Sequence, residues 1–234
     1  MAKLDGGNVM KKYLGGMVLA LWCCSSANAA LLERLGGQAY YDTDRNITWL
    51  ANANLAATNT FGVTGIALNG RMTWSEANEW IAAMNSANYL GVNDWRLPTT
   101  LQPDPSCQIQ SSGVSWGYFC TGSEMGHLFY GELGGVALQS IVTTHNANYN
   151  LFSNVQSYIY WSGTVYAPAP GSNAWLFGFD GGGQDNTNQT LALHVWAVRP
   201  GDIVPVPAAV WLFGSAMGVF GIVRRRARTS VADA

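Results

Sequence analysis

The segment NAWLFGFDGGGQDNTNQTLALHVWAVRP, residues 173–200, contains two apolar runs separated by polar residues. Trp175, Phe177 and Phe179 alternate along the first run, which is the pattern of a strand with one buried face. Residues 191–200 alternate in the same way and predict the strand that closes the sheet. Residues 180–190 are rich in Gly, Asn and Asp, so we expect a polar loop between the two strands.

The stretch TWSEANEWIAAMNSA, residues 73–87, has the pattern of an amphipathic helix. Thr73 and Glu76 match the Thr-x-x-Glu capping box that begins many helices. The apolar residues recur at helical spacing. The buried stripe is expected to consist of Trp74, Ala77, Ile81 and Met84.

A second helix is predicted in TGSEMGHLFYGELGG, residues 121–135, where Thr121 and Glu124 repeat the capping box. Its inner face is expected to consist of Met125, Leu128, Phe129 and Leu133, and its end is marked by Gly134 and Gly135. Glu124 and His127 share one helix face and could hold a metal ion together. Two ligands are too few for a metal site, so we interpret them as a capping Glu and a surface His.

The stretch YYDTDRNITWL, residues 40–50, predicts a hairpin with its turn at DTDRN. Three turn residues also occupy the first, third and fifth positions of a calcium loop: Asp42, Asp44 and Asn46. That motif needs Gly at the sixth position and Glu at the twelfth, where this chain has Ile47 and Ala53. We therefore predict a turn without a metal or cofactor, and a calcium ion is the alternative.

Cys107 and Cys120 are the two cysteines outside the first 30 residues, and an oxidising setting favours a disulfide between them. A reactive thiol pair is the alternative, but it lacks the Cys-x-x-Cys spacing. The sequence GVSWG, residues 113–117, matches the G-x-S-x-G pattern of a nucleophilic serine. Ser115 lies inside the cysteine loop instead of between a strand and a helix, so we interpret the match as chance.

Residues 1–29 have the order of a secretory signal peptide, in which a basic start precedes a short apolar core. The basic residues are Lys3, Lys11 and Lys12. Ala27 and Ala29 form an A-x-A site, so we expect export by the Sec machinery and cleavage after Ala29. The alternatives are an uncleaved anchor, for which the core is short, and lipidation at Cys23, which Trp22 disfavours.

Residues 206–223 contain 18 uncharged residues, about the minimum for a helix that spans a membrane. A basic cluster follows directly and consists of Arg224, Arg225, Arg226 and Arg228. The positive-inside rule keeps this tail in the cytoplasm and places the chain before Val204 outside. We expect this segment to attach the protein to the inner membrane, at least transiently.

The tail begins with Val204, Pro205, Val206 and Pro207, and the apolar helix and arginine cluster follow. This tripartite order resembles the PEP-CTERM sorting signal of Gram-negative bacteria. The resemblance implies that an exosortase, a membrane protease, processes the protein near the prolines, much as a GPI signal is removed. The family motif usually carries Glu where Val206 stands, so a permanent single-pass anchor is the alternative.

The chain between these ends suits one domain, placed at residues 30–201, with the sorting segment at residues 202–234. All three lysines lie in the signal peptide, and residues 30–204 have five arginines against twelve acidic residues, a net charge of about −7. This charge excludes nucleic acid as a partner, because such binding needs a basic surface. The lack of Lys also excludes P-loop and Schiff-base chemistry.

Seven phrases follow one another along residues 32–201: YYDTDRNITWL, MTWSEANEWI, WRLPTTLQ, SEMGHLFYGELGG, YWSGT, AWLFGFDGG and WAVRPG. In this order they resemble the Lcl C-terminal domain family, named for a bacterial collagen-like adhesin. The resemblance implies an α+β, C-type-lectin-like fold with a twisted antiparallel sheet, two helices and long irregular loops. It also implies binding and not catalysis. The adhesin relative recognises sulfated glycosaminoglycans, a ligand that the acidic charge disfavours here. The Glu-Pro-Asn and Trp-Asn-Asp motifs of calcium-dependent lectins are missing.

We therefore expect an exported protein of the cell surface or biofilm matrix that binds a polysaccharide or another surface protein. Sugar rings stack on aromatic side chains, and carboxylates and amides bind their hydroxyl groups. The candidate ligand-binding residues are Trp175, Asp180, Gln184, Asp185, Asn186, Asn188 and Trp196. The alternatives are that both tryptophans belong to the core, that the protein is an enzyme related to the formylglycine-generating proteins of the same fold, or that it is a matrix component without a ligand.

Overall fold

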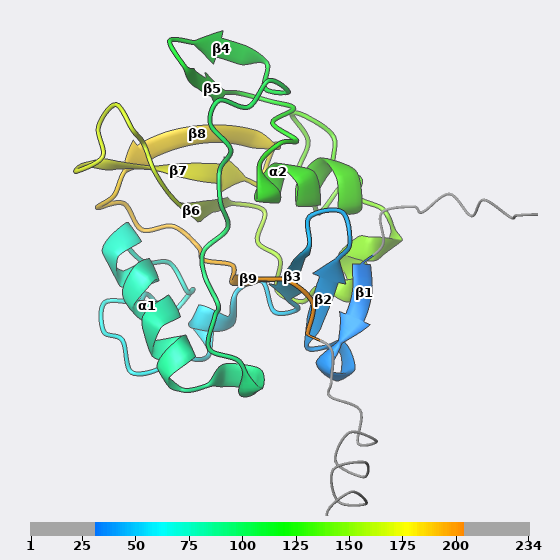
Figure 1. Ribbon diagram of the computed structural model, residues 1–234, viewed down its shortest axis with the longest axis vertical. Helices are drawn as coiled ribbons and strands as arrows, with labels where there is room; N and C mark the ends of the chain where they lie inside the picture. Colours follow the sequence, from blue (N-terminus) through cyan, green and yellow to red (C-terminus); the bar gives the residue numbers. More distant parts are fainter. Residues whose placement is uncertain (1–30, 204–234) are drawn as a thin grey trace, which may run out of the picture.

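The computed structural model describes residues 31–203, which form a mixed α/β fold with antiparallel sheets (Figure 1). The predicted signal peptide and all but the first two residues of the sorting segment lie outside the described residues. Within residues 31–203, no helix has the length and apolar character needed to cross a membrane. The combination of antiparallel sheets with separate helices confirms the α+β class for this region.

The first sheet is built on the predicted hairpin, which the structure confirms. Its strands lie in the order β1 (Leu31–Arg34), β2 (Ala39–Asp42), β3 (Ile47–Leu50) and β9 (Val198–Pro200). The Oδ1 atom of Asp42 accepts hydrogen bonds from the backbone N–H groups of Asp44 and Arg45, both at 3.0 Å. This side chain therefore fixes the turn by imitating a backbone carbonyl.

The second sheet corrects the predicted polar loop. Its strands lie in the order β6 (Ile159–Val165), β7 (Asn173–Gly178) and β8 (Gly183–Asn188). Most of the predicted loop is the strand β8, with turns at residues 179–182 before it and at residues 189–190 after it. β8 lies at the edge of the sheet with most of its side chains facing water, so it has no apolar alternation and resembles a loop in sequence.

The predicted closing strand over residues 191–200 is also wrong in extent, because only β9 is a strand. Residues 193–198 are all buried, so the apolar alternation does not mark one buried face. The run passes between the two sheets. Single bridges join Leu193 to Met72 and His194 to Tyr160, and Val198 then pairs with Trp49.

The first predicted helix is confirmed as α1 (Trp74–Ser86), and both hydrogen bonds of its capping box are present. Its buried residues are Ala77, Trp80, Ile81 and Met84. Trp74, which we expected in this stripe, is only half-buried. Its indole Nε1 instead donates to the carbonyl of Ser162 at 2.9 Å, which holds the start of the helix against β6.

The second helix is shorter than predicted. α2 (Glu124–His127) continues into a π-helical turn, η4 (Leu128–Glu132), and the predicted inner face is buried. Its predicted capping box is wrong, because Ser123 occupies the N-cap position and the Glu124 carboxylate binds elsewhere. Gly126 is required here, since an added Cβ would lie 1.8 Å from the backbone oxygen of Cys120.

Between α1 and α2 in the sequence, the chain forms a small hairpin of β4 (Ile109–Ser111) and β5 (Val114–Trp116). This hairpin lies above β8 in Figure 1. The predicted disulfide is present, with the sulfur atoms of Cys107 and Cys120 2.07 Å apart. Two backbone hydrogen bonds between Gly117 and Gln184, at 2.8 and 2.9 Å, attach this hairpin to β8. The disulfide loop is thus an extension of the second sheet.

Trp196 lies at the centre of the core, fully buried, and its indole N–H donates to the carbonyl of Leu50 at 2.7 Å. Edge-to-face contacts join it to Trp49 at 5.4 Å and Phe152 at 5.2 Å between ring centroids. The core is therefore aromatic and spans both sheets.

Short 3₁₀ turns lie at η1 (Leu35–Gly37), η2 (Leu55–Ala57), η3 (Tyr89–Gly91) and η5 (Ala147–Leu151).

Candidate functional site

Both tryptophans that we proposed as sugar platforms belong to the interior. Trp175 is 1% exposed and Trp196 is fully buried. Trp175 packs its ring edge against Tyr166, at 5.4 Å between centroids. Neither indole can stack on a ligand without unfolding part of the domain, so this part of the predicted site is wrong.

Three of the predicted residues do come together, in a surface hollow of about 380 Å³ between the disulfide loop and β8. Asp180, Gln184 and Asp185 line it. Asn186 and Asn188 do not. The side-chain oxygen of Asn186 accepts a hydrogen bond from Asn173, at the start of β7, at 2.9 Å. The side-chain oxygen of Asn188 accepts one from Thr190, just after the end of β8.

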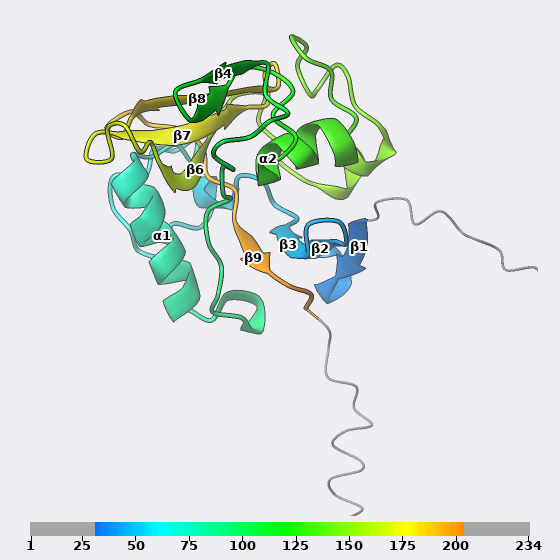
Figure 2. The ribbon, with the colours of Figure 1, turned by 45° about the horizontal axis from the view of Figure 1, so that its top comes forward.

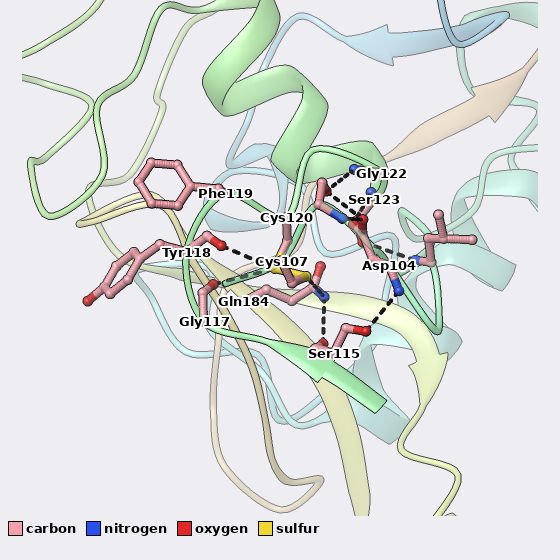
Figure 3. The surroundings of a disulfide bond; sticks show 12 residues. Asp104, Cys107, Ser115, Gly117, Tyr118, Phe119, Cys120, Gly122, Ser123 and Gln184 are labelled. Carbon is pink, nitrogen blue, oxygen red and sulfur yellow. Dashed lines mark hydrogen bonds between the residues drawn. A yellow bond between two sulfur atoms is a disulfide. The ribbon is translucent and has the colours of Figure 1, made fainter. Parts of the chain in front are cut away.

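The wall of the hollow comes from the disulfide loop, which sequence reasoning did not include in the site. Trp116 and Tyr118 line it, and both are half-buried. Figure 3 shows the side chains of Tyr118 and Phe119 extending away from the disulfide. The cluster of aromatic residues just before Cys120 was the signal that could have identified this wall.

The backbone of this wall is held rigidly at both ends. The carbonyl of Tyr118 accepts from the N–H of Gln108 at 2.9 Å, while Gly117 pairs with Gln184 across to β8. The disulfide then closes the loop. The aromatic side chains are therefore presented by a fixed scaffold, which lowers the entropy cost of binding a ligand.

Gln184 is among the residues that line the hollow, but it is only 1% exposed. Its Nε2 donates to the carbonyl of Ser115 at 3.2 Å and approaches the sulfur of Cys107 at 3.5 Å (Figure 3). Its Oε1 has no hydrogen-bond partner among the described residues. The side chain of Gln184 therefore joins the disulfide loop to β8 and is not offered to a ligand in the hollow.

The charge of the hollow is negative. Asp180 and Asp185 are exposed, and none of the lining residues is Lys or Arg. Leu138, 72% exposed, adds an apolar edge. Carboxylates accept hydrogen bonds and repel anions, so this surface suits a neutral, hydroxyl-rich ligand that has an apolar face.

Ser115, the serine of the G-x-S-x-G match, is fully buried below the hollow. Its hydroxyl donates to Gln110 Oε1 at 2.6 Å and accepts from the N–H of Asp104 at 3.0 Å. Asp104 lies near both cysteines, but the disulfide occupies their sulfur atoms, and its carboxylate accepts from the N–H groups of Ser106 and Ser123. These contacts hold the loop together.

The pair Glu124 and His127 is not brought together as a metal site. Glu124 turns to Arg96, and His127 is 15% exposed instead of lying on the surface. Its ring faces two other carboxylates, Asp42 and Glu132.

Compared with known proteins, the chain matches no family model and no curated protein sequence.

Proposed function

We propose that the protein is an exported, non-catalytic binding protein of the bacterial cell surface or matrix, and that its ligand is a neutral polysaccharide. The hollow between the disulfide loop and β8 is the proposed binding site. The observation that carries the proposal is the combination of exposed carboxylates with Trp116 and Tyr118 on a rigid wall. A sugar would place its C–H face on an aromatic ring and its hydroxyl groups on Asp180 and Asp185.

The acidic charge supports a neutral polymer over a sulfated one. With five arginines and no lysine between residues 30 and 204, the region offers few partners for sulfate groups. Arg34 and Arg199 are already paired with Asp202 and Asp94. An anionic polysaccharide would also meet the carboxylates of the hollow, and this repulsion would lower its affinity.

Export and sorting are proposed from the two ends of the chain, with the PEP-CTERM-like tail as the substrate of an exosortase. The C-type-lectin-like fold and the relation to the Lcl C-terminal domains are proposed in the same way, from the seven sequence phrases. The disulfide is compatible with folding in an oxidising compartment. Cell fractionation tests the location: the protein should be found in membrane or extracellular fractions, and cytoplasmic recovery of the full-length chain would contradict export.

The binding proposal is tested by screening the full-length protein on an array of neutral and anionic polysaccharides. Calorimetry on the strongest ligand then compares Tyr118→Ala and Asp185→Asn with wild type. Both variants change exposed or half-buried side chains, so they should keep the fold and weaken binding about five- to thirtyfold, since each removes about 1–2 kcal/mol of contact. Glu79→Gln, an exposed change on α1, is the matched control and should bind normally.

Two outcomes would contradict the proposal. Wild-type affinity in both hollow variants would place the ligand elsewhere on the surface. Binding to none of the polysaccharides would favour a protein ligand or a purely structural role.

A further inference from the structure

Three side chains that the sequence analysis kept apart converge at the end of the first hairpin. Asp42 ends β2, His127 ends α2 and Glu132 ends η4. His127 Nε2 lies 3.6 Å from Asp42 Oδ2 and 3.4 Å from Glu132 Oε1. All three ligand atoms lie within 4.8 Å of one another. Figure 2 shows α2 lying beside the β2–β3 hairpin, which brings these segments together.

The atoms that face one another have no hydrogen-bond partner among residues 31–203. This applies to Asp42 Oδ2, His127 Nε2 and both carboxylate oxygens of Glu132. Asp42 and Glu132 are each 1% exposed. Burying a carboxylate without a partner costs several kcal/mol, so native proteins pair such groups or bind a cation with them.

The second oxygen of Asp42 shows how this arrangement is fixed. Oδ1 is occupied by the two N–H groups of the hairpin turn, at 3.0 Å each. Oδ2 is therefore held towards His127 by the backbone of the hairpin. A side chain locked by its own hydrogen bonds is what a preformed metal site requires.

The π-helical turn brings the other two residues together. In an α-helix, residues five apart differ by about 140° around the axis, so His127 and Glu132 would face different sides. Here the N–H of Leu133 donates to the carbonyl of Leu128 at 2.8 Å, a bond that spans five residues and widens the turn. π turns are rare and frequently occur at functional sites.

We propose that Asp42, His127 and Glu132 bind one divalent transition-metal ion, with Zn²⁺ as the best match to these ligands. The chemistry supports Zn²⁺, because calcium and magnesium prefer oxygen ligands alone, whereas imidazole suits zinc. Two ligands about 2.0–2.2 Å from a tetrahedral ion lie roughly 3.3–3.6 Å apart. The two distances from His127 fall in this range. The ion would clamp the first hairpin to α2, and this proposal does not depend on the polysaccharide site.

The test uses full-length protein that has been stripped with a chelator and then titrated with zinc chloride in a calorimeter. Elemental analysis after dialysis should find one zinc per chain, and Zn²⁺ should raise the Tm. Glu132→Gln and His127→Ala should weaken zinc binding on the order of 100-fold or more, since each removes a direct ligand. His145→Ala, an exposed histidine elsewhere, is the control and should bind zinc normally.

Stability of the metal-free variants checks the fold independently. Glu132→Gln keeps the shape of the side chain and removes a buried charge, so the metal-free variant should melt at or above the wild-type temperature and lose the zinc-induced rise. If His127→Ala fails to fold, Glu132→Gln and Asp42→Asn carry the test. The proposal is overturned if wild type binds no zinc, or if these variants bind it as tightly as wild type does.

Discussion

Arg96 and Glu124 form a two-bonded ion pair, in which Nη1 donates to Oε2 at 2.8 Å and Nη2 donates to Oε1 at 2.7 Å. Oε2 also accepts the backbone N–H of Thr99 at 2.7 Å. The pair joins the loop after α1 to the first turn of α2. Glu124 therefore acts as a tertiary contact that positions α2, and the helix begins without its predicted capping box.

Replacing this arginine separates geometry from charge. Arg96→Lys keeps the positive charge but loses the parallel pair of hydrogen bonds. We expect the free energy of unfolding to fall by about 1–2 kcal/mol, measured by urea denaturation. A Glu124→Gln variant should lose a similar amount. If Arg96→Lys is as stable as wild type, the two-bonded geometry contributes nothing beyond charge.

The disulfide should stabilise both the domain and the hollow. Cys107 and Cys120 close a loop with a sequence separation of 13 residues, and the chain-entropy model gives about 3 kcal/mol for such a loop. The double variant Cys107→Ser, Cys120→Ser should have a lower Tm. It should also bind the polysaccharide more weakly, because the wall that carries Tyr118 would no longer be held by the disulfide. Unchanged binding at a temperature where the variant is folded would show that β8 alone holds the wall.

Variants of Trp175 and Tyr118 should distinguish a residue of the core from a residue of the binding site. Trp175→Ala should cost about 3–5 kcal/mol of stability, as expected for emptying a buried aromatic position. Tyr118→Ala should change stability by much less, because that side chain is half-buried, while it weakens ligand binding. Thermal melts and calorimetry on both variants check this. Stability losses of equal size would mean that Tyr118 also belongs to the core.

Local signals predicted the parts of this fold that local contacts determine. The α1 capping box, the turn at Asp42 and the single pair of cysteines in the domain each specify structure from neighbouring residues. Strand β8 was missed because an edge strand of polar residues carries no apolar period. The predicted loop over residues 180–190 nevertheless supplied Asp180, Gln184 and Asp185 to the hollow.

Contacts that depend on the tertiary fold could not be predicted in this way. His127 was considered with Glu124 because they are three residues apart, whereas its real neighbours include Asp42, which ends strand β2 and is far from α2 in the sequence. The π turn that brings Glu132 to the same face has no clear sequence pattern. Trp196 shows the same limit, since its position in the centre of the core depends on both sheets.

His194 should make the domain sensitive to mild acid. Burial lowers the pKa of its imidazole to about 4, with a smaller contribution from the charge of Arg71. The unfolded chain takes up this proton near pH 6.5, whereas the folded domain resists it until about pH 4, so stability falls as the pH drops between these values. The total loss from this group is about 3 kcal/mol, and it stays constant below pH 4.

A neutral replacement isolates this effect. His194→Gln cannot take up the proton, so its free energy of unfolding should depend less steeply on pH between 6.5 and 4 than that of wild type, measured by urea denaturation in the presence of a chelator. The lost contact between His194 Nδ1 and Asn54 Oδ1, 3.3 Å apart, lowers its stability at every pH without changing the slope. His145→Gln is the control and should run parallel to wild type, because His145 is exposed. Parallel curves for His194→Gln and wild type would show that His194 is already protonated in the folded domain near pH 6.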